Sequence, residues 1–136
     1  MKQTFTLSIL QKSPCAKLNQ HLFNEPREKK ARRPTKEVKW VENELKTWCE
    51  NKGYELVPEF RFNPYRKWKA DWYIKELNLI IEYEGIMSAK SRHTSKIGYS
   101  NDVEKYNSMQ SLGFILYRFT VLNYQTVIEE LEKNIK

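Results

Sequence analysis

The sequence predicts an α/β protein in which a four-stranded mixed sheet is flanked by helices, in the order α-β-β-β-α-β-α. Three segments repeat apolar residues at helical spacing, and four short segments between them are rich in aliphatic and aromatic residues. A chain of 136 residues has room for one domain. Residues 1–34 show no sustained period and are expected to form a partly irregular basic arm. Residues 35–136 are expected to form the folded domain.

The first helix is expected to begin at Thr35, whose hydroxyl can cap it, and to end near Lys52, before Gly53. Cys49 is expected as a buried thiol on its apolar side. Because Cys15 is distant and neither cysteine belongs to a C-x-x-C pair, the sequence favours neither a disulfide scaffold nor a zinc knuckle. The apolar side of this helix comprises Val38, Val41, Leu45, Trp48 and Cys49.

The second half of the domain is expected to contain two more helices and one strand. Asn101 is a candidate N-cap with Glu104 in the capping-box position, for a helix that ends before Gly113. The apolar run 114–119 is typical of a buried strand. A last amphipathic helix is expected from about Asn123. The apolar faces of the two helices are expected to consist of Val103, Tyr106 and Met109, and of Val127, Ile128, Leu131 and Ile135.

Three strands are expected between these helices, over about residues 55–63, 69–75 and 78–84. If Glu76 and Leu77 form a two-residue loop between the last two strands, Asp71 lies directly opposite Glu82, with β-carbons about 5 Å apart. Because side chains alternate along a strand, Glu84 shares the face of Glu82. Three carboxylates then converge where the apolar pattern predicts burial.

Carboxylates placed in this way repel one another, and burial raises the cost further. They can hold protons, or they can hold a divalent cation, for which Mg²⁺ and Mn²⁺ are suited by their preference for oxygen ligands. The remaining alternative is an acidic face exposed to solvent. The apolar residues around the two glutamates (LNLIIEYEG) favour the metal site.

The chain is basic, with 24 Lys and Arg against 17 Asp and Glu, a formal net charge of +7 and a pI of about 9.4. This balance favours an anionic partner such as nucleic acid or a lipid surface. Residues 27–36 hold six basic residues and one acid, and they either bind phosphates or form a solvated tail. Further cations flank the carboxylates and are the candidate nucleic-acid contacts: Arg61, Arg66, Lys67, Lys69, Lys90, Arg92 and Lys96.

Aromatic residues are interleaved with these cations, among them Tyr65, Trp68 and Trp72. The two tryptophans either stack on nucleobases or pack in the core. The first residues lack the continuous apolar stretch of a signal peptide, and no segment reaches membrane-spanning length. An intracellular, cytoplasmic protein with no membrane partner is therefore expected.

An Asp on one strand and E-x-E on the next, in this element order, resembles the PD-(D/E)XK nuclease superfamily. More closely, FRFNPYRKWKADWYIKELNLIIEYEG, followed by SRHTSKIGYSNDVEKYN and GFILYRFT, resembles small nucleases of phages and prophages over about residues 54–122. The resemblance implies a restriction-endonuclease-like core, DNA as the substrate, and Asp71 and Glu82 as metal ligands. Glu84 stands where the superfamily usually has Lys, so the identity of the catalytic base stays open.

Two residues are candidates to compensate for that lysine. Lys105, in the helix expected after Asn101, can supply a cation near the scissile phosphate, and His93, in a polar loop, can contact a phosphate or act as an acid. For both, the alternative is a solvated side chain. The first helix of the family often provides a further acid, for which Glu42 and Glu44 are the nearest candidates.

The sequence thus predicts a Mg²⁺- or Mn²⁺-dependent DNA endonuclease with Asp71, Glu82 and Glu84 as metal ligands, assisted by Lys105 and His93. Such small nucleases serve as junction resolvases, nicking enzymes or restriction-like enzymes, and cleavage of both strands by two sites would suit a homodimer. Two alternatives stay open. One is a catalytically inactive nucleic-acid-binding module of the same fold, and the other is a basic interaction protein with exposed acids.

Overall fold

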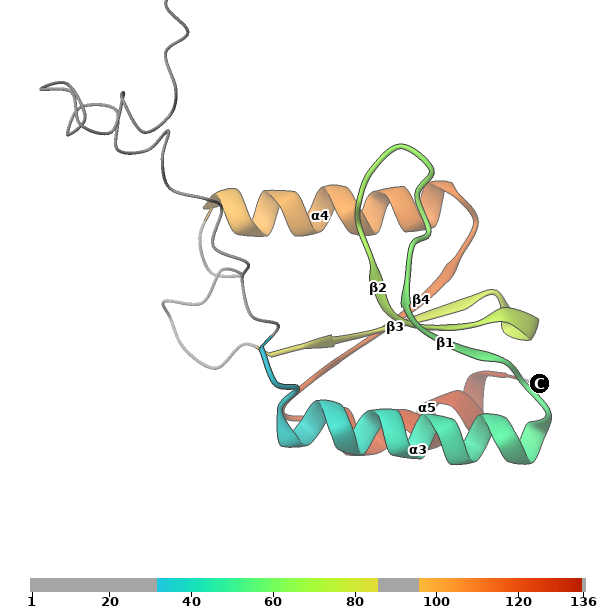
Figure 1. Ribbon diagram of the computed structural model, residues 1–136. Coiled ribbons are helices and arrows are strands. Elements are labelled where there is room, and N and C mark those ends of the chain that lie inside the picture. The colour runs from blue at the N-terminus through green and yellow to red at the C-terminus, as the bar shows by residue number, and fades with distance from the viewer. Residues whose placement is uncertain (1–31, 86–95, 136) are drawn as a thin grey trace, which may run out of the picture. The chain divides into compact units, whose positions relative to one another are not determined.

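The computed structural model describes residues 32–85 and 96–135. One compact unit begins at Pro34. Nearly all of the expected arm, residues 1–34, lies outside the described residues. The predicted element order is confirmed. The elements are α3 (Lys36–Lys52), β1 (Leu56–Phe60), β2 (Ala70–Ile74), the 3-10 helix η1 (Lys75–Leu77), β3 (Leu79–Glu84), α4 (Lys96–Ser111), β4 (Ile115–Thr120), the 3-10 helix η3 (Tyr124–Thr126) and α5 (Val127–Asn134) (Figure 1).

A single mixed sheet with the strand order β1-β2-β3-β4 forms the centre of the described unit. The first three strands pair antiparallel, and β4 joins β3 in parallel. Figure 1 shows α4 over one face of this sheet and α3 with α5 over the other. The predicted mixed sheet with helices on both sides is therefore confirmed. None of the described helices is both long enough and apolar enough to cross a membrane.

Each face of the sheet has its own apolar core. Leu79 and Ile81 of β3 belong to the cluster under α3 and α5, whereas Ile80 belongs to the cluster that contains Met109 of α4. Alternation along β3 produces this division, and it leaves the strand buried on both faces. The same alternation directs Glu82 and Glu84 toward α4.

Both ends of α3 are capped as the sequence predicts. The Thr35 hydroxyl accepts a hydrogen bond from the Val38 N–H, and Gly53 ends the helix with a φ of 74°, in the left-handed region that glycine adopts without strain. Cys49 is buried among the core residues, as predicted, and burial raises the pKa of its thiol to about 11. The helix packs its apolar side on the sheet.

The predicted start of the second helix at Asn101 is wrong, because α4 begins at Lys96. Polar residues that often cap helices lie inside it, and the Ser100 hydroxyl donates to the Lys96 carbonyl oxygen one turn back. Met109 is fully buried as predicted, but Val103 is 37% exposed and lies off the face that contacts the sheet.

The strand expected over residues 114–119 is confirmed as β4, but its expected burial is wrong. The strand β4 lies at an edge of the sheet, so Ile115 remains 52% exposed and Phe119 is the buried member of the strand. The last helix begins with η3, and Asn123 does not cap it, since its side-chain oxygen accepts from the Thr120 N–H instead.

Candidate active site

The connection between β2 and β3 determines where the carboxylates lie. It is the 3-10 helix η1, closed by Asn78 with a φ of 49°, and not the two-residue loop that the sequence suggested. The register is nevertheless the predicted one, because Trp72 pairs with Ile81. Asp71 and Glu82 are the next positions along the two strands, so their side chains meet at the end of the β2–β3 ladder.

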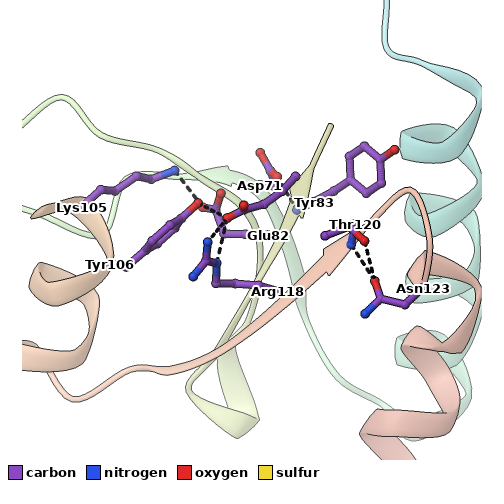
Figure 2. A network of polar contacts seen from close by, with 9 residues as sticks. Asp71, Glu82, Tyr83, Lys105, Tyr106, Arg118, Thr120 and Asn123 are labelled. Carbon is purple, nitrogen blue, oxygen red and sulfur yellow. Dashed lines mark hydrogen bonds and ion pairs between the residues drawn. The ribbon is translucent and has the colours of Figure 1, made fainter. Parts of the chain in front are cut away.

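Asp71 is held in place by the main chain of β3. Its Oδ2 atom accepts a hydrogen bond of 2.8 Å from the Tyr83 N–H (Figure 2). Burial raises the pKa of the Asp71 carboxyl, whereas the hydrogen bond from Tyr83 and the charge of Lys105 oppose that rise. The carboxylate is therefore fixed in position but poor in compensating positive charge.

Glu82 is the most buried acid of the site, with 4% of its surface exposed. Its Oε1 atom lies 2.9 Å from Nζ of Lys105, a residue of α4. Burial, and then the negative charge of Asp71, raise the pKa of Glu82 to about 7, although Lys105 pulls it down. Glu82 and Asp71 thus form a pair of adjacent carboxylates that share one lysine.

Glu84 has a different environment, although it lies on the same strand face. Its Oε1 atom accepts hydrogen bonds of 2.7 Å from Nε of Arg118 and 2.5 Å from the Tyr106 hydroxyl. The Arg118 guanidinium also lies over the Tyr106 ring at 4.0 Å. Burial, together with the hydrogen bond to Glu84, raises the pKa of Tyr106 above its usual value. The charge of Glu84 is therefore compensated by Arg118.

The three predicted metal ligands thus differ in their surroundings: Asp71 and Glu82 share Lys105, whereas Glu84 is paired with Arg118. Within residues 32–85 and 96–135, no three His, Cys, Asp or Glu side chains are grouped so as to hold a metal ion. Mg²⁺, however, commonly binds through one or two carboxylates and completes its coordination with water and substrate phosphate. Asp71 and Glu82 fit that smaller donor set, because they are adjacent, Glu82 is buried and Asp71 partly buried, and burial raises the pKa of both carboxyls.

A groove of about 680 Å³ opens beside Asp71, and Arg66, Lys67 and Lys69 form a basic rim along it. Arg66, which lies over the Trp68 ring at 4.7 Å, is also ion-paired with Glu104 of α4. Of the seven predicted nucleic-acid contacts, three line the groove. Its lining consists of Arg66, Lys67, Trp68, Lys69, Asp71, Asn101, Asp102, Glu104 and Lys105.

The other predicted contacts and the loop histidine are not brought to the groove. Arg61 and Lys96 are exposed but do not line it. Lys90, Arg92 and His93 fall in the segment 86–95, which the structure does not describe. Their predicted roles therefore remain predictions.

The two tryptophans have different positions. Trp72 is 3% exposed and belongs to the core under α3 and α5, so the interpretation as a core residue is confirmed for it. Trp68 is half-buried, its ring is stacked with that of Phe62 at a centroid distance of 6.3 Å, and the Arg66 guanidinium also lies over it. Trp68 thus helps to build the wall of the groove.

Sequence reasoning missed three residues of the site. Arg118 had a visible signal, as the charged residue within the apolar run FILYRF, whereas Tyr106 was expected only as a core residue. Glu59 has the left-handed φ of 48°, lies opposite Asp71 on β1, and adds to the rise in the pKa of Asp71. The first-helix acids do not join the site: α3 covers the other face of the sheet, where Glu42 pairs with Lys46 and Glu44 is exposed.

Comparisons of the chain with protein-family models, curated proteins and solved structures found no match. The chemistry of the site therefore has to carry any functional interpretation. It consists of two adjacent carboxylates, a lysine in direct contact with one of them, and a groove with a basic rim. Such an arrangement can bind a divalent cation and an anionic, phosphate-bearing chain.

Proposed function

We propose that the protein is a divalent-metal-dependent endonuclease that hydrolyses DNA phosphodiester bonds. The observation that carries this proposal is the position of Asp71, Glu82 and Lys105: two adjacent carboxylates share one lysine, and Asp71 and Lys105 line the groove rimmed by Arg66 and Lys67. The proposal includes a restriction-endonuclease-like core, for which the resemblance of the sequence and the mixed sheet with E-x-E on β3 are the grounds.

Asp71 and Glu82 would hold the metal, Mg²⁺ or Mn²⁺. When bound, the cation supplies Lewis-acid polarisation of the phosphate and lowers the pKa of a bound water. Tyr83 keeps the Asp71 carboxylate oriented through its N–H. The cations of the rim bind backbone phosphates and hold the DNA beside the carboxylates, which makes the attraction sensitive to salt.

Lys105 is assigned the role that the superfamily usually gives to the lysine of its motif. The chain has Glu84 at that position, but Nζ of Lys105 lies 2.9 Å from Glu82 and lines the groove. From there its ammonium can bind a phosphate oxygen and stabilise charge that develops on it. Glu84 is assigned a supporting role, because its bonds to Tyr106 and Arg118 join α4 and β4 to β3.

A catalytically inactive DNA-binding module is the second candidate, and one observation favours it. Arg118 neutralises Glu84, so only two acids remain for a cation. Incubation of the protein with linear, nicked and branched DNA, in Mg²⁺, Mn²⁺ or a chelator, separates the candidates. Metal-dependent cleavage supports the enzyme, and salt-dependent binding without cleavage supports the module. Absence of both would leave a basic interaction protein. If duplexes are cut on both strands, the protein is expected to act as a homodimer.

A further inference from the structure

Tyr65 lies in the connection between β1 and β2 with 93% of its surface exposed. In Figure 1 this connection rises from the sheet beside α4. Arg66 and Lys67 follow Tyr65 directly, and both line the groove that leads to Asp71. An exposed aromatic ring therefore lies next to the basic rim of the candidate active site.

The turn that carries Tyr65 is held in one shape by Asn63. The side-chain oxygen of Asn63 accepts from the N–H groups of Tyr65 and Arg66, at 2.8 Å and 2.9 Å. Its amide nitrogen donates to the hydroxyl of Ser108 on α4 at 2.8 Å. The ion pair of Arg66 with Glu104 attaches the turn to α4 a second time. The backbone under Tyr65 is thus fixed while its ring faces solvent.

An exposed aromatic ring on a fixed turn, beside a row of cations, is a combination that binds single-stranded nucleic acid. The cations bind the phosphates, and the ring stacks on a base, whatever its sequence. Within an uninterrupted duplex the base faces are already stacked on one another. A ring in the position of Tyr65 therefore finds a partner only where a base is unpaired or a helix ends.

We propose that Tyr65 is a stacking site for an unpaired nucleobase, and that the substrate carries single-stranded nucleotides next to the groove, as at a flap, a gap or a branch point. This inference rests on the proposed function and specifies its substrate class. The backbone of the unpaired segment passes Arg66 and Lys67, and this places the adjoining phosphodiester near Asp71. Trp72 cannot take this role because it is buried in the core.

Binding is measured in a chelator, so that no DNA is cut, with a fluorescent single-stranded oligonucleotide and with a fluorescent closed circular duplex that contains the same sequence and has no helix end. Tyr65→Ala is expected to weaken binding of the single strand by about 5-fold to 150-fold and that of the duplex by less than about 2-fold. Tyr65→Trp, which keeps a stacking surface, is expected to retain the affinity of the parent. A 2-aminopurine base in the single strand is expected to be quenched by the parent and not by Tyr65→Ala.

Tyr99→Ala is the matched control, because it removes a tyrosine that is 61% exposed, from α4, and that does not line the groove. It should change neither affinity. Equal single-strand binding by the parent and Tyr65→Ala would overturn the inference, as would an equal loss for both DNAs. Unchanged DNA binding is also the result expected if Tyr65 docks a protein partner instead. Selective loss in a protein that never cleaves DNA would refute the proposed function alone, whereas metal-dependent cleavage without a Tyr65 effect would refute only this inference.

Discussion

Nζ of Lys105 and Oε1 of Glu82 lie 2.9 Å apart, and only 17% and 6% of the two side chains are exposed (Figure 2). The contact joins α4 to β3 and places a positive charge beside two carboxylates. Among the described residues, Lys105 is the one cation that lowers the pKa of both Asp71 and Glu82. When both carboxyls are ionised, one positive charge faces two negative charges, so the site has an excess of negative charge. A divalent cation would remove that excess, and in its absence the excess should be visible in the stability of the protein.

Lys105→Met is expected to reduce DNA cleavage by about 100-fold or more, as is typical when one charge-stabilising donor is removed from a hydrolytic site. The methionine side chain keeps most of the volume of lysine, so α4 should stay folded. Lys46→Met, which breaks an exposed ion pair with Glu42 on α3, is the control and should cleave at the rate of the parent. Single-turnover cleavage rates decide this, and a parental rate for Lys105→Met would remove Lys105 from the mechanism.

Asp71→Asn and Asp71→Ala are both expected to abolish cleavage, but they should differ in stability. Asparagine keeps a side-chain oxygen for the Tyr83 N–H, whereas alanine leaves that donor without its acceptor, at a cost of about 1–2 kcal/mol. Urea unfolding of the two variants in a chelator measures the difference. Cleavage by either variant would exclude Asp71 as an essential ligand, and equal stability would mean that the hydrogen bond contributes nothing.

The stability of the metal-free protein should fall as the pH rises from about 4.5 to about 7. The pKa of Glu82 is about 7 in the folded protein against an ordinary value of 4.5, so the folded state binds a proton more tightly than the unfolded state does. Losing that proton costs stability, and the cost is complete above about pH 7. Glu82→Gln should flatten this profile and raise the free energy of unfolding at about pH 8 by about 1–3 kcal/mol.

Urea unfolding between about pH 5 and about pH 8 in a chelator provides the profile. Glu129→Gln, on the exposed side of α5, is the matched control and should leave the slope over this range unchanged. A parent whose stability does not change over this range, or a Glu82→Gln variant that is less stable than the parent at the upper end, would contradict the raised pKa of Glu82.

Glu84→Lys is expected to destabilise the protein by about 3–5 kcal/mol, because it would place an ammonium beside the Arg118 guanidinium at a position that is 7% exposed. Metal affinity and cleavage should fall together. Glu84→Gln keeps an oxygen for Tyr106 and Arg118 and should cost less. Thermal unfolding measures the stability, calorimetric titration the metal affinity, and a cleavage assay the activity. If Glu84→Lys is as stable as the parent and cleaves DNA, the role assigned to Glu84 is wrong.

The pairing of Asp71 with Glu82 could be predicted from the sequence, because it depends on residues that are close together along the chain. The short connection between β2 and β3 and the alternation of side chains were enough to place Asp71 beside Glu82. Arg118 could not be placed in this way. It lies opposite Glu82 in the parallel pairing of β3 with β4, and that register depends on how α4, which connects the two strands along the chain, packs on the sheet.

Two other departures concern α4 and the connection between β1 and β2. Asn101 has the local signature of an N-cap, but α4 already begins at Lys96, five residues earlier. Tyr65 has the same sequence surroundings as Trp68, yet Trp68 packs on Phe62 and Tyr65 is exposed. That difference comes from the turn that Asn63 closes, which a pattern of apolar and charged residues does not reveal.

If the Asp71–Glu82 pair is a metal-dependent hydrolytic centre, cleavage of a supercoiled plasmid carrying an unpaired loop should depend on both the metal and Glu82. The parent, Glu82→Gln and Glu129→Gln are compared in Mg²⁺, in Mn²⁺ and in a chelator. We expect the parent and Glu129→Gln to cut in either metal and not in the chelator, and Glu82→Gln to be inactive throughout. No metal-dependent cutting by the parent, or cutting by Glu82→Gln at the rate of the parent, would show that the pair is not such a centre.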